Sequence, residues 1–365
     1  MLKQQKIFFD FLRFCIGSAK EIPDSLKDAD WKELYCIAQM QALLGVLFYG
    51  IRRLPKELAP EQKLLIQWMA MAEIIRKQNV RLFLDSVNVC QNFKNEGFAN
   101  CILKGQGNAL LYPDPYMRTS GDIDIYLAGG RNRVMQYINK VCPNQVMRYH
   151  HVDFPVMKTP IEVHFTPSYM FFPVHNRRVQ EWFKEVMDLQ CSNVVKLPDG
   201  YGEITMPTMN FNVIYILSHL YRHVFTEGIG LRQLIDYYFV LVKSEEQSVK
   251  NLTALQHELK NLGLWKFAQA VMYVLHETLG LPEEKMIAPI DVNEGRFLLA
   301  EIMQGGNFGQ YDTRLGSKEN EGKLHRYLRM CLRNLRFVKH YPTEALSEPL
   351  FRTWFALWKK IHGIR

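Results

Sequence analysis

Apolar residues recur at intervals of three and four along the first 96 positions, which is the period of a helix with one buried face. Pro23, Pro55 and Pro60 interrupt the pattern and mark connections between helices. The helices predicted here cover residues 6–17, 31–54 and 61–96. This part of the chain is therefore expected to be helical.

Short apolar runs replace the helical period between residues 97 and 165. Glycines and polar residues bound these runs, as they commonly bound strands. The predicted strands are residues 98–103, 123–127, 146–154 and 161–165. We expect a small sheet with helices packed on it.

Helical periodicity returns after residue 209, and Gly263, Gly280 and Pro282 mark expected helix ends. The predicted helices are residues 212–224, 231–242, 252–262 and 265–279. The pattern as a whole predicts an α+β fold with three regions. They are an N-terminal helical region at 1–96, an α/β core at 97–209 and a C-terminal helical region at 210–365.

The composition is that of a folded protein, since 48% of the 365 residues are hydrophobic and 12% are aromatic. No apolar run approaches the roughly 20 residues that a bilayer span requires, and residues 1–17 lack the cleavage site of a signal peptide. The seven cysteines are odd in number and form no CxxC pair, which argues against a disulfide framework or a zinc ribbon. We expect a soluble, cytoplasmic protein without a membrane span.

The net charge of +8 is concentrated at the C-terminal end, where residues 314–365 contain twelve Lys and Arg against four Glu. Aromatic side chains among these charges would suit a polyanion such as RNA. Their helical spacing favours the alternative, a tail with a solvated basic face. Its apolar face, which includes Tyr327, Leu328, Leu332 and Phe337, is expected to pack on the body of the protein.

An unusual acidic pair opens the predicted strand at 123–127. Residues two apart share a face of a strand, so Asp122 and Asp124 present exposed carboxylates side by side while the intervening isoleucine faces the core. Paired like charges favour a bound cation, and oxygen ligands suit Mg²⁺ or Mn²⁺. Glu162, in another predicted strand, supplies the third carboxylate that a two-metal site needs. An edge strand with two solvated Asp residues is the simpler alternative.

A glycine-containing turn precedes the acidic pair. Lys104-Gly105-Gln106-Gly107 follows a predicted strand and opens a short helix, where glycines let backbone N–H groups approach a phosphate. The turn is not a P-loop, because G-x-x-x-x-G-K-[ST] is absent. Lys104 would add a positive charge, and Arg118 could bridge two triphosphate oxygens as a bidentate fork.

Histidines provide further candidates. His219 and His223 lie four apart on a predicted helix, a spacing that can hold a metal, although packing or hydrogen bonding beside a cleft is favoured. His164 shares a face with Glu162 and is expected to support the metal ligands. A wider transition-metal site has no ligand spacing in its favour. Its members would be His150, His151, Asp153, His164 and His175.

Asp236 lies inside an apolar predicted helix, where an unpaired charge is unfavourable. It is expected either to pair with Arg222 or Arg232 or to reach the cleft. The pattern does not decide between these roles.

Residues 103–127 contain L-K-G, Y-P, R and G-D-I-D-I-Y-L at the spacing of the uncharacterised bacterial nucleotidyltransferase family in the polymerase-β-like superfamily, which the chain resembles. The resemblance covers nearly the whole chain and is sharpest from 103 to 165. It implies a small mixed β-sheet core with metal at Asp122, Asp124 and Glu162, and with the glycine turn at the nucleotide phosphates. Gln106 departs from the superfamily, which usually has Gly-Ser or Gly-Gly in this turn.

The resemblance implies an enzyme that uses Mg²⁺ or Mn²⁺ to transfer an NMP from an NTP to an acceptor, releasing pyrophosphate. A small-molecule or protein acceptor is favoured over nucleic acid, because the basic tail is expected to pack on the body. Two alternatives stay open. One is a catalytically inactive nucleotide-binding or regulatory module, which the departure at Gln106 supports, and the other is an RNA-directed nucleotidyltransferase, which the basic tail permits.

Overall fold

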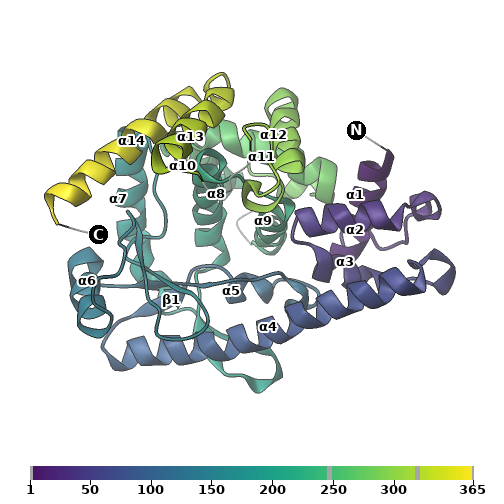
Figure 1. Ribbon diagram of the computed structural model, residues 1–365, viewed down its shortest axis with the longest axis horizontal. Coiled ribbons are helices and arrows are strands. Elements are labelled where there is room, and N and C mark those ends of the chain that lie inside the picture. Colours follow the sequence, from purple (N-terminus) through teal and green to yellow (C-terminus); the bar gives the residue numbers. More distant parts are fainter. Residues whose placement is uncertain (1–2, 245–248, 317–320, 364–365) are drawn as a thin grey trace.

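The computed structural model describes residues 3–244, 249–316 and 321–363. Within these ranges the protein is an α+β fold in which helices surround a small mixed sheet (Figure 1), and the predicted fold class is confirmed. No helix in the described ranges is long and apolar enough to cross a bilayer. Residues 317–320 and the last two residues of the predicted basic tail lie outside the described part.

The N-terminal region is helical, but the single helix predicted for 31–54 is wrong, because two helices occupy that segment. The Asp30 side chain accepts hydrogen bonds from two backbone N–H groups and so caps the first of them. Ala42 then adopts a φ of 56°, which ends the helical path before the second begins. The helices are α1 (Lys3–Ile16), α2 (Trp31–Met40), α3 (Leu44–Ile51) and α4 (Gln62–Asn95), with 3₁₀ turns η1 (Asp24–Asp28) and η2 (Lys56–Leu58).

Four short strands form the main sheet in the order β1-β2-β4-β3. Their bounds are β1 (Asn100–Ile102), β2 (Ile123–Leu127), β3 (His151–Asp153) and β4 (Ile161–His164), and β5 (Val194–Lys196) and β6 (Glu203–Thr205) form a separate hairpin. β2 is parallel to β4 and antiparallel to β1, while β3 is antiparallel to β4. Since β2 lies between two partners, the alternative of an edge strand for the acidic pair is wrong.

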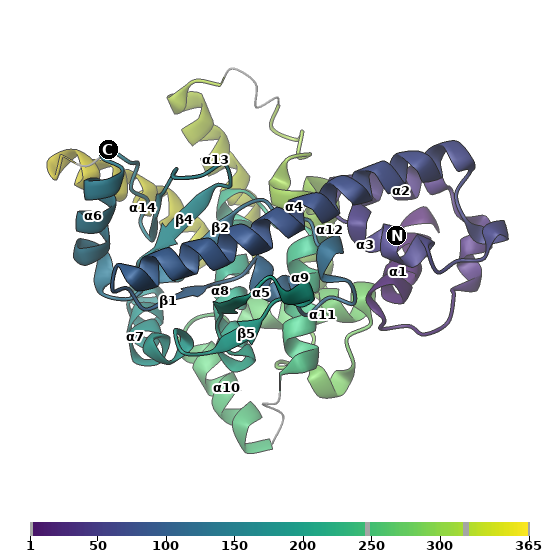
Figure 2. The same cartoon turned by 90° about the horizontal axis from the view of Figure 1, so that it is seen from below.

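One face of this sheet is apolar and packs on α4. Ile123, Ile125 and Val163 share a core with Phe83 of α4. Figure 2 shows α4 running across the sheet. Because side chains alternate along a strand, Asp124 and its neighbours on the adjacent strands face the opposite way.

The remaining helices lie on both sides of the sheet, since Val134 and Ile138 of the helix after β2 share the apolar core with α4. They are α5 (Gln106–Ala109), α6 (Gly130–Val141), α7 (Pro173–Gln190), α8 (Met209–Thr226), α9 (Leu231–Lys243), α10 (Val249–Asn261), α11 (Trp265–Leu279), α12 (Val292–Gly305), α13 (Lys323–Val338) and α14 (Pro342–Ile361), with 3₁₀ turns η3 (Pro115–Met117), η4 (Pro198–Gly200), η5 (Glu283–Lys285) and η6 (Asn307–Gly309). Leu12 of α1, Tyr215 of α8 and Phe337 of α13 belong to one apolar core. The boundaries at residues 96 and 209 stay a prediction.

The basic tail forms two neighbouring helices, α13 and α14. Phe337 is buried against Phe225 of α8, as expected of the apolar face. Two of the expected leucines contradict the expectation, because Leu328 is 51% exposed and Leu332 is 55% exposed. The exposed apolar side chains of the pair are Leu324, Leu328, Leu332, Leu335, Leu346, Leu350, Trp354, Leu357 and Ile361. Arg333 and Phe337 turn inward, while a stripe of leucines, together with Trp354 and Ile361, is left outside.

A buried ion pair joins α9 to the segment that leads into β2. Two guanidinium nitrogens of Arg118 donate to the Asp236 carboxylate at 2.7 and 2.8 Å, and the Tyr112 hydroxyl donates to the same carboxylate at 2.7 Å. Burial would raise the pKa of Asp236, but Arg118 lowers it. The prediction that Asp236 pairs with Arg222 or Arg232 is therefore wrong.

We predict that Arg118→Met lowers the free energy of unfolding by about 3–5 kcal/mol, because it leaves Asp236 buried without its partner. The stabilisation by the ion pair should be complete above the ordinary pKa of Asp and should decrease as the pH falls through the lowered pKa of folded Asp236. Urea denaturation at several pH values measures both effects. Arg76→Met, which removes an exposed pair with Glu73, is the control and should leave the midpoint unchanged. Equal behaviour of the two variants would contradict the prediction.

Candidate active site

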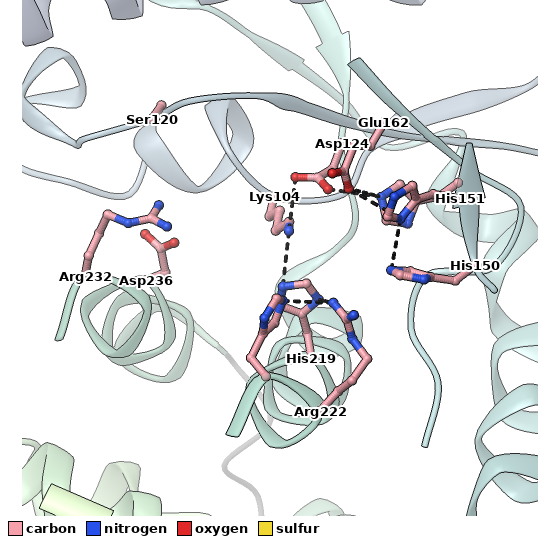
Figure 3. Close-up of polar contacts among 12 residues, drawn as sticks. Lys104, Ser120, Asp124, His150, His151, Glu162, His219, Arg222, Arg232 and Asp236 are labelled. Carbon is pink, nitrogen blue, oxygen red and sulfur yellow. Dashed lines mark hydrogen bonds and ion pairs between the residues drawn. The ribbon is translucent and has the colours of Figure 1, made fainter. Parts of the chain in front are cut away.

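The two central strands bring Asp124 and Glu162 together. They are direct neighbours in the parallel register of β2 and β4, and Figure 3 shows their carboxylates close together. Asp122, immediately before β2, lines the same cleft as Glu162. The structure therefore brings the three predicted carboxylates to one side of the sheet.

Asp124 is buried, with 1% of its side chain exposed, and the expectation that it is solvated is wrong. His164 Nε2 lies 3.0 Å from its Oδ1, and Lys104 Nζ lies 3.1 Å from its Oδ2 in an ion pair without hydrogen-bond geometry. The Lys104 ammonium is also 3.1 Å from His219 Nε2. Lys104 thus lies between the sheet and α8, where it compensates the charge of Asp124.

The three carboxylates differ in pKa because their surroundings differ. The charge of Asp124, together with burial, raises the pKa of Asp122 to about 6. Burial would raise the pKa of Asp124 as well, but Lys104 and His164 hold it well below its ordinary range. Burial opposes the ionisation of Glu162 too, and hydrogen bonding with His164 lowers its pKa. The site therefore carries concentrated negative charge at neutral pH.

Three histidines adjoin these carboxylates. His164 Nε2 is 3.6 Å from Glu162 Oε2, and His151 Nδ1 is 3.4 Å from the same oxygen. His150 Nε2 lies 3.2 Å from His151 Nδ1. Burial lowers the pKa of His150, and it lowers the pKa of His151 to about 3, so both rings are neutral at pH 7.

α8 faces the carboxylates across the cleft (Figure 3). His219 and His223 are one turn apart with ring centroids separated by 4.4 Å. Arg222 Nη2 lies 2.8 Å from His223 Nε2 and 3.4 Å from His219 Nδ1. The two predicted histidines therefore make polar contacts at the border of the cleft.

The cleft has a volume of about 670 Å³ and two chemically different walls. Asp122, Glu162 and His164 lie on the sheet side. The opposite side contains basic residues from α8, α13 and α14. They are Arg222, Arg326, Arg329, Arg333, Arg352 and Lys359, and the acids Glu227, Asp312 and Glu348 line the cleft among them.

The glycine turn is placed differently from the prediction. Gly105 and Gly107 are both buried, and neither lines the cleft. A Cβ atom on Gly107 would lie 3.2 Å from Met206, so this glycine permits close packing. Gln106 donates to Asn79 of α4 at 3.2 Å, and its side chain is thereby directed away from the carboxylates. Of this turn, only Lys104 reaches the cleft.

Two other predicted residues lie elsewhere. Arg118 is held by Asp236 and donates its remaining Nη1 to Ser120 at 2.6 Å, so its guanidinium is not available as a fork for phosphate. His175 pairs with Glu344 at 3.1 Å, away from the other histidines of the wider metal set. Both side chains have structural roles in this fold.

A family comparison adds an independent observation. Residues 27–280 match the family described as uncharacterised nucleotidyltransferase, a stretch of more than half of the chain. The chain belongs to this nucleotidyltransferase family. No significant match was found among curated proteins or among solved structures.

The donor atoms of the site fit a divalent cation. Asp124, Glu162 and His164 place one ligand atom each within 4.8 Å of one another, and so do His151, Asp153 and Glu162. Asp122 and Asp124 repel each other, and a cation bound between them would relieve this repulsion. His150, His151 and His164 form a third such group, although His175 is not part of it.

The basic wall of the cleft was not predicted from the sequence. Arg222, Arg333 and Arg352 line the cleft, and two of them come from the tail that was expected to be merely solvated. Their charge was visible in the sequence, but the face of each helix that meets the cleft depends on how α13 and α14 pack on α8. The one sequence feature that could have indicated the basic wall is an Arg on the apolar side of a helix, as Arg333 is one turn before Phe337.

We predict that Mn²⁺ raises the stability of the wild-type protein and that Glu162→Gln removes this effect. Ligand binding at 100 times its Kd stabilises a fold by about 2.7 kcal/mol, and the variant removes one anionic ligand from a side chain that is 32% exposed. Thermal unfolding with and without Mn²⁺ measures the difference. Glu203→Gln, on the exposed side of β6, is the control and should respond like the wild type. An equal response of Glu162→Gln would place the metal elsewhere.

Proposed function

We propose that the protein is a metal-dependent nucleotidyltransferase that transfers an NMP from an NTP to an acceptor hydroxyl. The observation that carries this proposal is the pairing of Asp124 with Glu162 on adjacent parallel strands, beside Asp122, in a chain of this family. A module that only bound a nucleotide would not require three clustered carboxylates. Without a cation, the repulsion between these carboxylates is unfavourable. Their presence therefore supports a catalytic metal site over an inactive nucleotide-binding module.

Asp122, Asp124 and Glu162 would hold Mg²⁺ or Mn²⁺. The metal, when bound, supplies charge to the triphosphate and lowers the pKa of a coordinated hydroxyl. The imidazole of His164 is 3.0 Å from Asp124 and fixes the direction of that carboxylate. Because imidazole suits transition metals better than Mg²⁺, any direct contact of His164 with the ion would favour Mn²⁺.

Lys104 supplies the positive charge closest to these carboxylates. In this structure its ammonium contacts Asp124 and His219, and 21% of its side chain is exposed. A metal ion bound to Asp124 would neutralise its charge in place of Lys104. The Lys104 ammonium could then contact a phosphate oxygen. We therefore assign Lys104 to the nucleotide phosphates, and we leave Gly105 and Gly107 a packing role.

Glu162 is the carboxylate that an acceptor can approach most readily. Its side chain is 32% exposed, whereas that of Asp124 is 1% exposed. His151 lies 3.4 Å from one oxygen of Glu162 and helps to orient it. An acceptor hydroxyl placed beside Glu162 would have a proton acceptor within reach.

We predict that label from an α-labelled NTP is incorporated into an acceptor in the presence of Mn²⁺, whereas label from a γ-labelled NTP is not. Incubation with each NTP and fractions of a cell lysate reports donor and acceptor together. Asp122→Asn should lower incorporation by about 100-fold or more, as the loss of a charge-stabilising group in an active site does, and Glu203→Gln should not. Incorporation of γ-label alone would indicate phosphoryl transfer and contradict the proposal.

A further inference from the structure

The basic wall of the cleft lies largely outside the residues that define the family. The family match ends at residue 280, while α13 and α14 begin at Lys323 and Pro342. These two helices nevertheless contribute Arg333, Arg352 and Lys359 to the cleft that contains the carboxylates. The C-terminal helices therefore add a basic surface to the common nucleotidyltransferase site.

Arg333 is the most unusual residue of this wall. It is 8% exposed, and its Nη1 has no hydrogen-bond partner among the described residues. The nearby carboxylate of Asp312 is held by Arg314 and Arg336 at 2.8 and 3.0 Å. No carboxylate in the described ranges lies within 4.0 Å of the Arg333 guanidinium, although burial lowers its pKa only to about 10 and it stays charged at pH 7.

Arg222 repeats these features on α8. It is also 8% exposed, and its Nε has no hydrogen-bond partner among the described residues. Its guanidinium lies over the Tyr169 ring at 5.2 Å and contacts the neutral ring of His223. Neither contact neutralises its charge, and within the described ranges no carboxylate lies within 4.0 Å of this guanidinium.

Two other cations of the wall have acidic partners. Arg352 pairs with Glu348, and Arg329 pairs with Glu321 at 2.7 Å. Buried guanidinium groups in folded proteins are ordinarily paired, because an uncompensated buried charge is strongly unfavourable. Arg222 and Arg333 face the same cleft, and neither guanidinium has a carboxylate within 4.0 Å among the described residues. Glu227, Glu301 and Asp312 act on these charges only from farther away. A bound anion would supply the missing partner.

We propose that Arg222 and Arg333 form a phosphate-binding subsite opposite the carboxylates. Guanidinium forks match the oxygens of a phosphoryl group, and Arg is well suited to such bidentate contacts. The phosphoryl group belongs either to the β,γ-phosphates of the donor NTP or to a phosphorylated acceptor. This inference deepens the proposed function, but the binding of phosphate itself does not depend on catalysis.

The test is the binding of inorganic pyrophosphate in EDTA, measured by titration calorimetry. Without a divalent metal the carboxylates cannot attract pyrophosphate, so any binding that is measured comes from the basic wall. Wild-type protein should bind pyrophosphate, and Arg333→Gln and Arg222→Gln should each weaken this binding about 10-fold or more, as expected for the loss of a charge-assisted contact. Arg76→Gln is the control, because Arg76 pairs with Glu73 on α4 and does not line the cleft, and it should bind like the wild type.

Thermal unfolding of the same variants separates binding from a structural role. Without pyrophosphate, Arg333→Gln should be at least as stable as the wild type, because it removes an uncompensated buried charge. Pyrophosphate should then raise the melting temperature of the wild type and not that of the variant. A variant that is less stable but binds pyrophosphate normally would overturn the proposal, and so would wild-type protein that fails to bind it.

A competition experiment with ATP identifies the source of the phosphate. If the donor occupies the subsite, ATP should displace pyrophosphate, and Arg333→Gln should weaken ATP binding while leaving AMP binding unchanged. If the acceptor occupies it, protein saturated with ATP and Mn²⁺ should still bind pyrophosphate, and this binding should still require Arg333. Either outcome supports the subsite. These measurements involve no turnover. Pyrophosphate binding can therefore be found even if no α-label is incorporated, and α-label can be incorporated even if pyrophosphate does not bind at this subsite.

Discussion

The need to compensate a buried carboxylate determines how this site is built. Asp124 has almost no exposed surface and lies beside two other acids, which is tolerable only with positive charge and hydrogen-bond donors within contact distance. β4 supplies His164, and the segment after β1 supplies Lys104. The sheet order that places β2 in the centre is therefore also the order that brings both partners to Asp124.

The opposite wall of the cleft has the complementary property. Arg222 and Arg333 carry buried positive charge without an acidic partner among the described residues, while the carboxylates carry buried negative charge that Lys104 offsets only in part. A substrate with phosphates, together with a metal ion, would compensate both walls at once. The charges of the two walls thus favour a phosphate-bearing ligand between them, which is what a nucleotidyltransferase requires.

Local sequence patterns predicted the elements that carry the carboxylates. The alternation in Ile123–Leu127 and in Ile161–His164 is strong because one face of each strand is fully apolar, and both strands were placed correctly. The break at Ala42 escaped prediction, since its neighbours keep the apolar helical pattern while its own backbone leaves the helix. Boundaries of this kind depend on tertiary packing and not on local composition.

Long-range pairing accounts for the other differences. Arg118 and Asp236 are 118 residues apart, and no local signal distinguishes an Arg that binds a buried Asp from one that binds phosphate. The same limit applies to the tail, where the amphipathic pattern of α13 was evident but the choice of which face meets the cleft was not. The burial of Gly107 likewise follows from its contact with Met206, and Gln106 is held by Asn79 of α4, and neither contact is local in the sequence.

The metal site is tested most directly by the anomalous scattering of Mn²⁺ in a crystal grown with a non-hydrolysable NTP analogue. We expect a peak in contact with the carboxylates of Asp122, Asp124 and Glu162, with the α-phosphate as a further ligand. A peak bound by His150 and His151 without Asp122 or Asp124, or an analogue bound outside the cleft, would contradict this expectation.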